Sequence, residues 1–489
     1  MASEAMSALT GGTFLVAMAL LLGASNFQIG LLASLPTLTN IFQLVAIRLL
    51  QKYNNRRAIA VLCNGFARFP LLIIGFLPLL FTTGTSIQVL IFLLFFHYFF
   101  GSVAGASWNS WMKDLVPEKR LGSYFSQRTR ITQTLNVFLS LTLALVLDYV
   151  KRVNPGMELS TYGYMFISGG ILGLLGTWIL SKTPEPISNL PKENLLRLFK
   201  KPLADKNFRN LLFFNSFWSF ALNVATPFFT VYMMRNLDLA LSYIICFVIM
   251  SQIAGIFSVK IWGKHSDKFS NKTIIKIAAP MYILCILSWP FASMPSSFLM
   301  TILVVAAINI MSGVATSGIN LALNNIGIKL APKNEAIVYL SAKNMLVAFV
   351  SALGPLLGGL LADFFANRSF VWNVQWHGPN GSSTLHLLEL HNIGFLFVIA
   401  GILATIALRT LHFVKEEGEV SKDLAIAEMK VGFKTSFKDS MKREAILSFL
   451  YYSPVQYQKT LHRKLKNRIE HRVVNMRKWR HALGARNTA

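Results

Sequence analysis

Long apolar segments alternate with short polar ones along most of the chain. Each apolar segment has about 20 residues, enough for one α-helix to cross the hydrocarbon core of a bilayer. The pattern predicts twelve spanning helices, six on each side of a polar stretch at 182–209. The expected ranges are 4–24, 28–50, 58–80, 87–111, 123–149, 162–181, 210–234, 239–262, 273–293, 297–327, 336–365 and 390–413.

The two halves of the chain resemble each other at a fixed spacing of 215 positions. This shift carries residues 108–148 onto 323–363, and it also carries Arg57 onto Lys272 in a different loop. The superposed pairs include Asn109 and Asn324, Pro117 and Pro332, Tyr124 and Tyr339, Ser126 and Ser341, Arg128 and Lys343, and Asp148 and Asp363. Chance identity in apolar sequence is the alternative. A fixed offset favours a repeated structural unit, so we expect related six-helix bundles at 1–181 and 210–414.

Composition narrows the class of protein. Apolar residues make up 54% of the chain and charged residues 14%, whereas a soluble domain has about a quarter charged residues. So little charged surface predicts an all-α polytopic membrane protein. The three cysteines fall inside apolar segments, where we expect buried packing residues and not metal ligands. Motifs for nucleotide binding, cofactors or hydrolysis are not seen, so we expect no enzyme.

The net charge of +26 is concentrated in alternate loops and in the C-terminal tail. Basic residues gather in cytoplasmic loops of membrane proteins, so this distribution predicts a cell-membrane protein with both termini in the cytoplasm, and argues against nucleic-acid binding. Residues 415–489 form a basic tail in which Leu461, Leu465 and Ile469 recur at helical spacing. An amphipathic helix there would bind anionic lipid or a cytoplasmic partner; a solvated tail is the simpler alternative.

Two loops carry a motif known from a transporter family. The loop Gly263-Lys264-His265-Ser266-Asp267-Lys268-Phe269-Ser270-Asn271-Lys272 follows the eighth predicted span. The corresponding loop of the first half keeps Arg56 and Arg57 but has Lys52 where the motif has aspartate. With its twelve spans, the chain resembles the major facilitator superfamily over about residues 1–414. Basic loops of any polytopic protein are the alternative explanation.

The resemblance implies two bundles that open alternately to the two sides of the membrane, with gating residues at the cytoplasmic loops. Asp114 and Arg128 resemble the acid and base that the family places around the loop between spans four and five. We expect Gly263 to let two helices approach closely and Asp267 to cap a helix or pair with a base. The full set of expected gating residues is Arg56, Arg57, Asp114, Arg128, Gly263, Asp267 and Lys343.

A second family motif, Gly-Pro-x-x-Gly-Gly, marks many drug–proton antiporters when it lies in span five. Here it occurs as Gly354-Pro355-Leu356-Leu357-Gly358-Gly359 in span eleven, the position equivalent by repeat. Glycine and proline allow helices to bend and pack closely. We therefore expect a packing and flexing site and not an antiporter signature.

The resemblance also implies that spans one, four, seven and ten line a central cavity. The polar side chains in spans four, seven and ten are the solute-binding candidates: His97, Tyr98, Ser102, Asn215, Trp218, Asn223, Asn309, Thr316 and Asn320. In span ten, Asn309, Ser312, Thr316 and Asn320 share one helical face, which suits a cavity or hydrogen bonds between helices.

Ionisable groups inside the spans are few. His97 would suit a coupling proton or a solute contact, with a structural histidine as the alternative. Arg68 in span three would hold an anion or form a structural ion pair. No Asp or Glu lies in the middle of a span, which disfavours ordinary proton symport and leaves His97, facilitated diffusion or another ion.

The sequence thus predicts a secondary transporter of the major facilitator type, moving a small solute by alternating access. The pattern names neither the solute nor the direction. The alternative is a transporter-like scaffold or assembly factor that acts through its basic tail, motivated by that tail and by Lys52 in the degenerate loop.

Overall fold

The computed structural model describes residues 1–80, 83–186, 200–294, 297–332, 335–378, 381–416 and 418. Met1–Val420 forms one compact unit. The predicted amphipathic helix of the tail lies outside the described residues.

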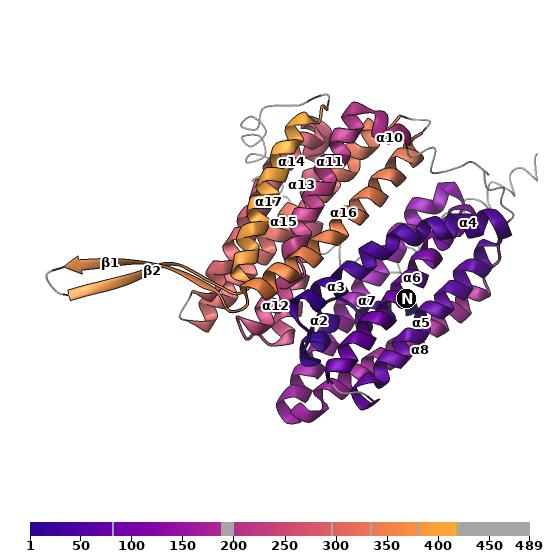
Figure 1. The fold of residues 1–489 in the computed structure, drawn as a ribbon. Helices are drawn as coiled ribbons and strands as arrows, with labels where there is room; N and C mark the ends of the chain where they lie inside the picture. The colour runs from indigo at the N-terminus through magenta and orange to yellow at the C-terminus, as the bar shows by residue number, and fades with distance from the viewer. Residues whose placement is uncertain are drawn as a thin grey trace, which may run out of the picture. The chain divides into compact units, whose positions relative to one another are not determined.

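The first half is a group of long helices joined by short turns (Figure 1). Its elements are α1 (Ala2–Thr10), α2 (Gly12–Leu21), α3 (Asn26–Leu38), η1 (Thr39–Phe42), α4 (Gln43–Tyr53), α5 (Arg56–Leu80), α6 (Thr83–Leu115), α7 (Glu118–Val153), η2 (Pro155–Met157) and α8 (Glu158–Ser181). Together α1 and α2 make the first span, and α3 to α4 the second.

The second half repeats this arrangement. Its elements are α10 (Lys200–Ala204), α11 (Lys206–Ala225), α12 (Phe228–Arg235), α13 (Leu241–Phe269), α14 (Asn271–Ser288), η3 (Trp289–Ser293), α15 (Phe298–Leu330), α16 (Ala336–Phe365), α17 (Gly394–Thr410) and η4 (Leu411–Phe413). Eleven helical segments in the described ranges are long and apolar enough to span a membrane. With the interrupted segment α11–α12 they give the twelve-helix, two-bundle arrangement that the sequence predicts.

The first and seventh spans are interrupted at equivalent positions, which the sequence pattern did not reveal. The first span breaks at Gly11, with Gly12 at a φ of +57°, a left-handed conformation that favours glycine. The seventh breaks at Thr226 and Pro227. Proline has no N–H group for the helical hydrogen bond. Gly12 and Pro227 lie 215 positions apart, so different residues interrupt the same span of each half.

The predicted loop at 366–389 is instead mainly a β-hairpin, and α17 starts four residues later than expected. Strands β1 (Ser369–Gly378) and β2 (Gly381–His391) pair antiparallel, with Phe370 opposite Leu390 and a bulge after Trp372. Alternation of apolar and polar residues in β1, followed by a Gly-Pro-Asn-Gly sequence, favours a hairpin. The prediction failed because a polar segment between spans was read as loop.

Candidate functional site

Two aspartates join the halves at one end of the spans, which we call the far end; the basic loops mark the opposite, basic end. Asp148, near the end of α7, accepts hydrogen bonds from the backbone N–H groups of Leu241 (3.0 Å) and Ser242 (2.8 Å), where α13 starts. A carboxylate at a helix N-terminus satisfies free N–H groups and complements the helix dipole. The end of α7 is therefore tied to the start of α13 in the other half.

Asp363 makes the same contact in reverse. It lies near the end of α16 and accepts hydrogen bonds from the backbone N–H groups of Asn26 (3.0 Å) and Phe27 (2.9 Å), where α3 starts. The shift of 215 positions carries Asp148 onto Asp363, and it carries Asn26 onto Leu241. The two connections are thus related by the internal repeat, and we call them the aspartate clamps.

Further contacts close the far end around the clamps. Arg235, the last residue of α12, donates from its guanidinium to the carbonyl of Ala24 and the side-chain oxygen of Asn26, both at 3.4 Å. The Gly-Pro-x-x-Gly-Gly motif of α16 packs on α3, since a Cβ atom on Gly359 would lie 2.6 Å from the Cα of Phe27. On its other side, Gly358 meets the carbonyl of Val224 in α11. This geometry agrees with the packing interpretation of the motif.

At the basic end, Arg56 forms the centre of a charged cluster inside the first half. Its side chain is only 1% exposed, and its Nη1 lies 2.5 Å from Asp114 Oδ2 of α6. The backbone N–H of Arg56 donates to Glu185 Oε1 at 2.6 Å, and its Nη2 donates to the carbonyl of Pro186 at 3.1 Å. The segment after α8, which contains Glu185 and Pro186, is thereby bound to the start of α5 and the end of α6.

The second half has a corresponding cluster around Glu416. This carboxylate is 3% exposed and accepts from the backbone N–H of Lys272 (2.7 Å) and the side-chain amide of Asn271 (2.8 Å) at the start of α14. The Nζ of Lys329, at the end of α15, lies 3.3 Å away. Asp114 and Lys329 are 215 positions apart, so the acid of one cluster is replaced by a base in the other.

Sequence reasoning missed Glu185 and Glu416. Each follows the last span of its half and binds the start of the third span of that half. The signal that could have found them is their shared position, directly after spans six and twelve.

The other expected gating residues have varied surroundings. Arg57 is exposed. Arg128 is exposed and its guanidinium lies 5.0 Å from the ring centre of Trp108. Lys343 is buried and its Nζ donates to the carbonyl of Leu323 at 3.2 Å. Trp108 and Leu323 are themselves equivalent by the shift of 215 positions, so both basic residues contact the same point of the preceding span.

The loop Gly263–Lys272 differs from expectation at two points. A Cβ on Gly263 would come no closer than 3.9 Å to a neighbouring side chain, so the expected close approach is not there. It occurs instead at Gly313 of α15, where a Cβ would lie 2.0 Å from the carbonyl of Ser251. Asp267 lies in the last turn of α13, but its side chain is outside the described part. Ser270 and Glu416 cap the start of α14.

Of the three candidates on α6, His97 contacts α5. His97 is buried, and its Nδ1 donates to the carbonyl of Ala67 at 2.6 Å. Tyr98 is half-buried beside it. The hydroxyl of Ser102 is buried and has no hydrogen-bond partner among the described residues. Arg68 is buried too, with its Nε unpartnered in the same part of the chain. Buried polar atoms without hydrogen-bond partners are costly, and Ser102 Oγ and Arg68 Nε are two such atoms in the described part of the chain.

The candidates on α11 and α15 are partly bonded to their own helices. Asn215 and Trp218 are buried, whereas Asn223 donates to the carbonyl of Ser219 at 2.8 Å. On α15, Asn309 donates to Val305 and Thr316 to Ser312. Asn320 is exposed. The polar stripe of α15 is thus least covered toward its basic end.

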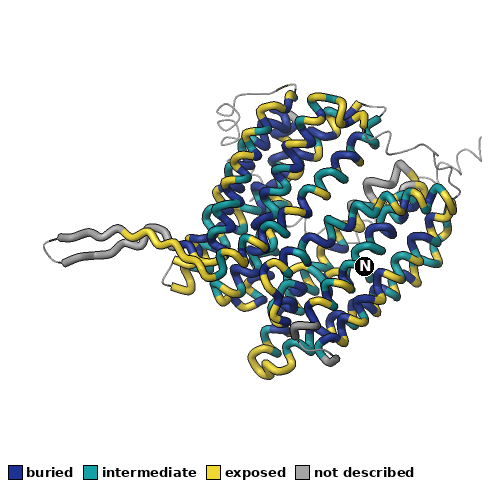
Figure 2. The backbone as a smooth tube through the Cα atoms, in the orientation of Figure 1, coloured by how far each residue is buried: buried dark blue, intermediate teal, exposed yellow. Residues whose placement is uncertain are grey.

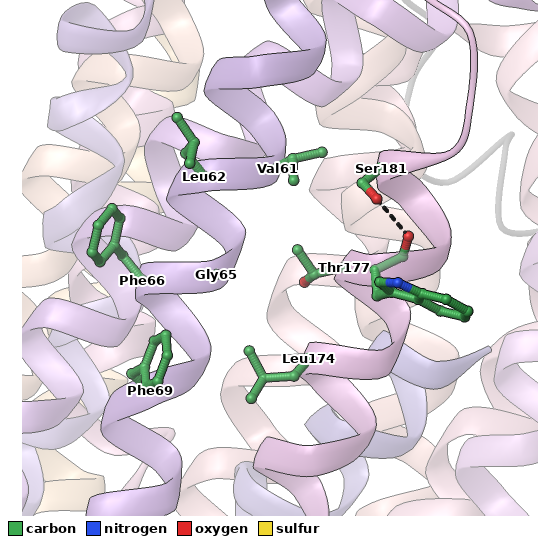
Figure 3. A pocket seen from close by; sticks show the side chains of 9 residues that line it. Val61, Leu62, Gly65, Phe66, Phe69, Leu174, Thr177 and Ser181 are labelled. Atoms are coloured by element: carbon green, nitrogen blue, oxygen red, sulfur yellow. Dashed lines mark hydrogen bonds between the residues drawn. The ribbon is translucent and has the colours of Figure 1, made fainter.

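A groove of about 360 Å³ between α5 and α8 is a different feature (Figure 3). Its lining is apolar and includes Phe66, Phe69 and Trp178, which are all more than half exposed. Ser181 donates its hydroxyl to the carbonyl of Trp178, and none of the lining residues is charged. Such a surface suits lipid chains.

Comparison with known proteins decides the family. A sequence model of the Major Facilitator Superfamily matches residues 1–355. The chain belongs to this superfamily. This match confirms the major facilitator fold predicted from the spans and the repeat. Superfamily members are membrane transporters that bind small solutes, and not enzymes. A comparison with curated proteins gave no match.

Solved structures of other superfamily transporters share the fold. The nucleoside transporter NupG has a TM-score of 0.59 and 14% identity, covering 85% of this chain and 98% of its own. XylE, the xylose transporter from E. coli in an inward open conformation, has 0.58 and 14%, covering 87% and 98%. A D-xylose–proton symporter has 0.60 and 15%, covering 86% and 96%. At these identities the likeness concerns the fold alone.

Proposed function

We propose that this major facilitator protein is a secondary transporter that moves a small solute across the cell membrane by alternating access. The observation that carries the proposal is the pair of aspartate clamps. Each clamp joins the two halves, and each lies at the far end of the spans. Two symmetric connections at one end support a hinge in which that end opens while the other closes.

The clamps are suited to reversible opening. Each consists of a carboxylate and two backbone N–H groups, so separation exposes groups that water can solvate. By contrast, the Arg56 and Glu416 clusters hold helices of the same half together. In this proposal each half moves as a unit, the basic end faces the cytoplasm with both termini, and the far end faces outward. The cytoplasmic side follows from the basic loops.

The solute would bind between the halves, at the polar candidates of α6, α11 and α15. Ser102, Asn215 and Asn320 are the positions best suited to direct contact, because their side chains form no hydrogen bond within the described part of the chain. The lack of a carboxylate in the middle of the spans supports facilitated diffusion or a coupling ion bound elsewhere, and His97 is the group that would carry a coupling proton.

A thermal-shift screen of the purified protein tests solute binding. Nucleosides and pentoses come first, followed by amino acids, organic anions and drugs. We expect one class to raise the unfolding temperature in a concentration-dependent way, since ligands that bind only the folded protein stabilise it. We expect Asn320→Ala to lose this shift while its unliganded stability is unchanged. Ser317→Ala is the matched control, because Ser317 contacts α13 near Gly255.

Equal solute shifts in Asn320→Ala and Ser317→Ala would contradict the assigned binding face. If no solute class stabilises the wild-type protein, or if the stabilising solute does not exchange across proteoliposomes, the transporter proposal fails. The scaffold alternative rests on the basic tail, whose residues from 419 onward lie outside the described part of the chain.

A further inference from the structure

The β1–β2 hairpin exposes large apolar side chains at its base. Phe370, Val371 and Trp372 are 51%, 44% and 57% exposed. Figure 1 shows the hairpin extending away from the helices, and Figure 2 shows exposed backbone positions where it leaves them. Large exposed apolar patches mark sites that contact another protein or a membrane, so this segment is a candidate for such a contact.

The two faces of the hairpin differ in composition. Side chains alternate along a strand, so Phe370 and Trp372 of β1 share one face. In the ladder, Leu390 lies opposite Phe370 and Leu388 lies opposite Trp372. The other face of this part of β1 carries Ser369, Val371 and Asn373. The described base of the hairpin therefore has one aromatic face and one more polar face.

The aromatic face is the one turned toward the ends of the helices. Leu390 is only 6% exposed, and β2 contacts η3 and α17. A Cβ atom on Gly394 would lie 3.7 Å from Leu390 Cδ2 and 4.0 Å from Pro290 Cβ, so Leu390 packs near the start of α17. Phe370 is directly opposite Leu390 and lies on the same face. Where β1 extends beyond the helices, this face contacts the medium around the protein.

The helix side that leads into the hairpin exposes apolar side chains. On α16, Leu360 and Phe364 are 55% and 57% exposed, as expected of a helix side in contact with acyl chains. Four residues after Phe364, the guanidinium of Arg368 lies 3.6 Å from the ring centre of Phe364 and donates to its carbonyl. Phe370 and Trp372 follow. This order, with an apolar helix surface followed by an arginine and then a tryptophan, is typical of a chain that passes from the hydrocarbon core into the headgroup region.

We propose that the hairpin lies in the headgroup region of the bilayer at the far end of the spans. The face that carries Phe370 and Trp372 contacts lipid, and the face that carries Val371 contacts water. The two strands satisfy one another's inner N–H and C=O groups, but their outer edges need water, so the hairpin stays in the interface and does not enter the hydrocarbon. It anchors the ends of α16 and α17 at the membrane surface. This role is independent of the transported solute.

Three consecutive single-cysteine variants test the proposal: Phe370→Cys, Val371→Cys and Trp372→Cys. All three positions are exposed in the protein itself, so only a membrane distinguishes them. Each variant is made after replacing Cys63, Cys246 and Cys285, labelled with an environment-sensitive fluorophore and reconstituted in phosphatidylcholine–phosphatidylglycerol vesicles. We expect blue-shifted emission at 370 and 372, with quenching by lipids carrying a nitroxide near the headgroup, and water-like, weakly quenched emission at 371.

Equal quenching at the three positions would overturn the proposal. A second outcome would also overturn it: positions 370 and 372 are shielded only under conditions in which Trp372→Cys cross-links two copies of the chain. The surface covering this face would then be a second protein molecule. If the cysteine-free protein does not fold, Cys285 is retained, since it is buried and shielded from the label. The unfolding temperature of each labelled protein is compared with wild type to confirm folding.

Discussion

At the scale of single residues, four carboxylates organise the ends of the spans. Asp148 and Asp363 join the halves, whereas Glu185 and Glu416 hold helices within a half. The sequence indicated that Asp148 and Asp363 are equivalent, because they share the repeat. It did not indicate their partners, because a backbone N–H group at a helix start looks the same in any sequence. Glu185 and Glu416 were missed since they lie in polar segments that resemble ordinary loops.

Arg56 should contribute strongly to stability, and its neighbour Arg57 should not. Arg56→Met removes charged hydrogen bonds to Asp114 and Pro186 and leaves acidic groups without their base, which we expect to cost about 2 kcal/mol in the free energy of unfolding. The exposed Arg57→Met should change it by less than about 0.5 kcal/mol. Thermal unfolding in detergent, followed by tryptophan fluorescence, measures both. Similar losses in the two variants would show that the buried cluster has no special role.

At the scale of elements, the apolar pattern predicted the spans well but not their interruptions. The breaks at Gly11–Gly12 and Thr226–Pro227 lie within apolar segments, where hydropathy carries no information about helix continuity. Discontinuous helices commonly line solute sites in transporters, and these two belong to the spans that the family resemblance places at the cavity. The hairpin was missed for a related reason: its alternating pattern is short and follows a long helix.

Two glycines should respond to alanine with opposite signs. A Cβ on Gly358 would lie 2.2 Å from the carbonyl of Val224, so Gly358→Ala must push α16 from α11 and should cost about 1–3 kcal/mol. Gly65 of α5 has no atom within 4 Å of such a Cβ, so Gly65→Ala should stabilise the helix by about 0.5–1 kcal/mol. Unfolding temperatures of the two variants test this. A destabilised Gly65→Ala or an unaffected Gly358→Ala would contradict the described packing of these helices.

At the scale of the whole molecule, the internal repeat accounts for the pairing of features. The clamps, the span interruptions and the charged clusters at the basic end each occur twice. Their members keep the spacing of 215 residues, except for Glu185 and Glu416. The sequence was sufficient for the twelve-helix fold, because apolar segments alternate with polar ones, and for its duplication, because matching residues recur 215 positions apart. Contacts between halves required the structure. The contacts between halves at the far end are the basis for alternating access.

Distances between spin labels at the two ends of the spans test this claim most directly, without a known solute. One pair replaces Met157 and Met294 at the far end, and the other replaces Tyr53 and Lys264 at the basic end, all exposed positions. Asp148→Asn with Asp363→Asn weakens both clamps by about 1–3 kcal/mol in total, a shift of up to about a hundredfold in population. Alternating access predicts that this change lengthens the far-end distance and shortens the basic-end distance. An unchanged far-end distance, or movement of both ends in the same direction, would contradict the account.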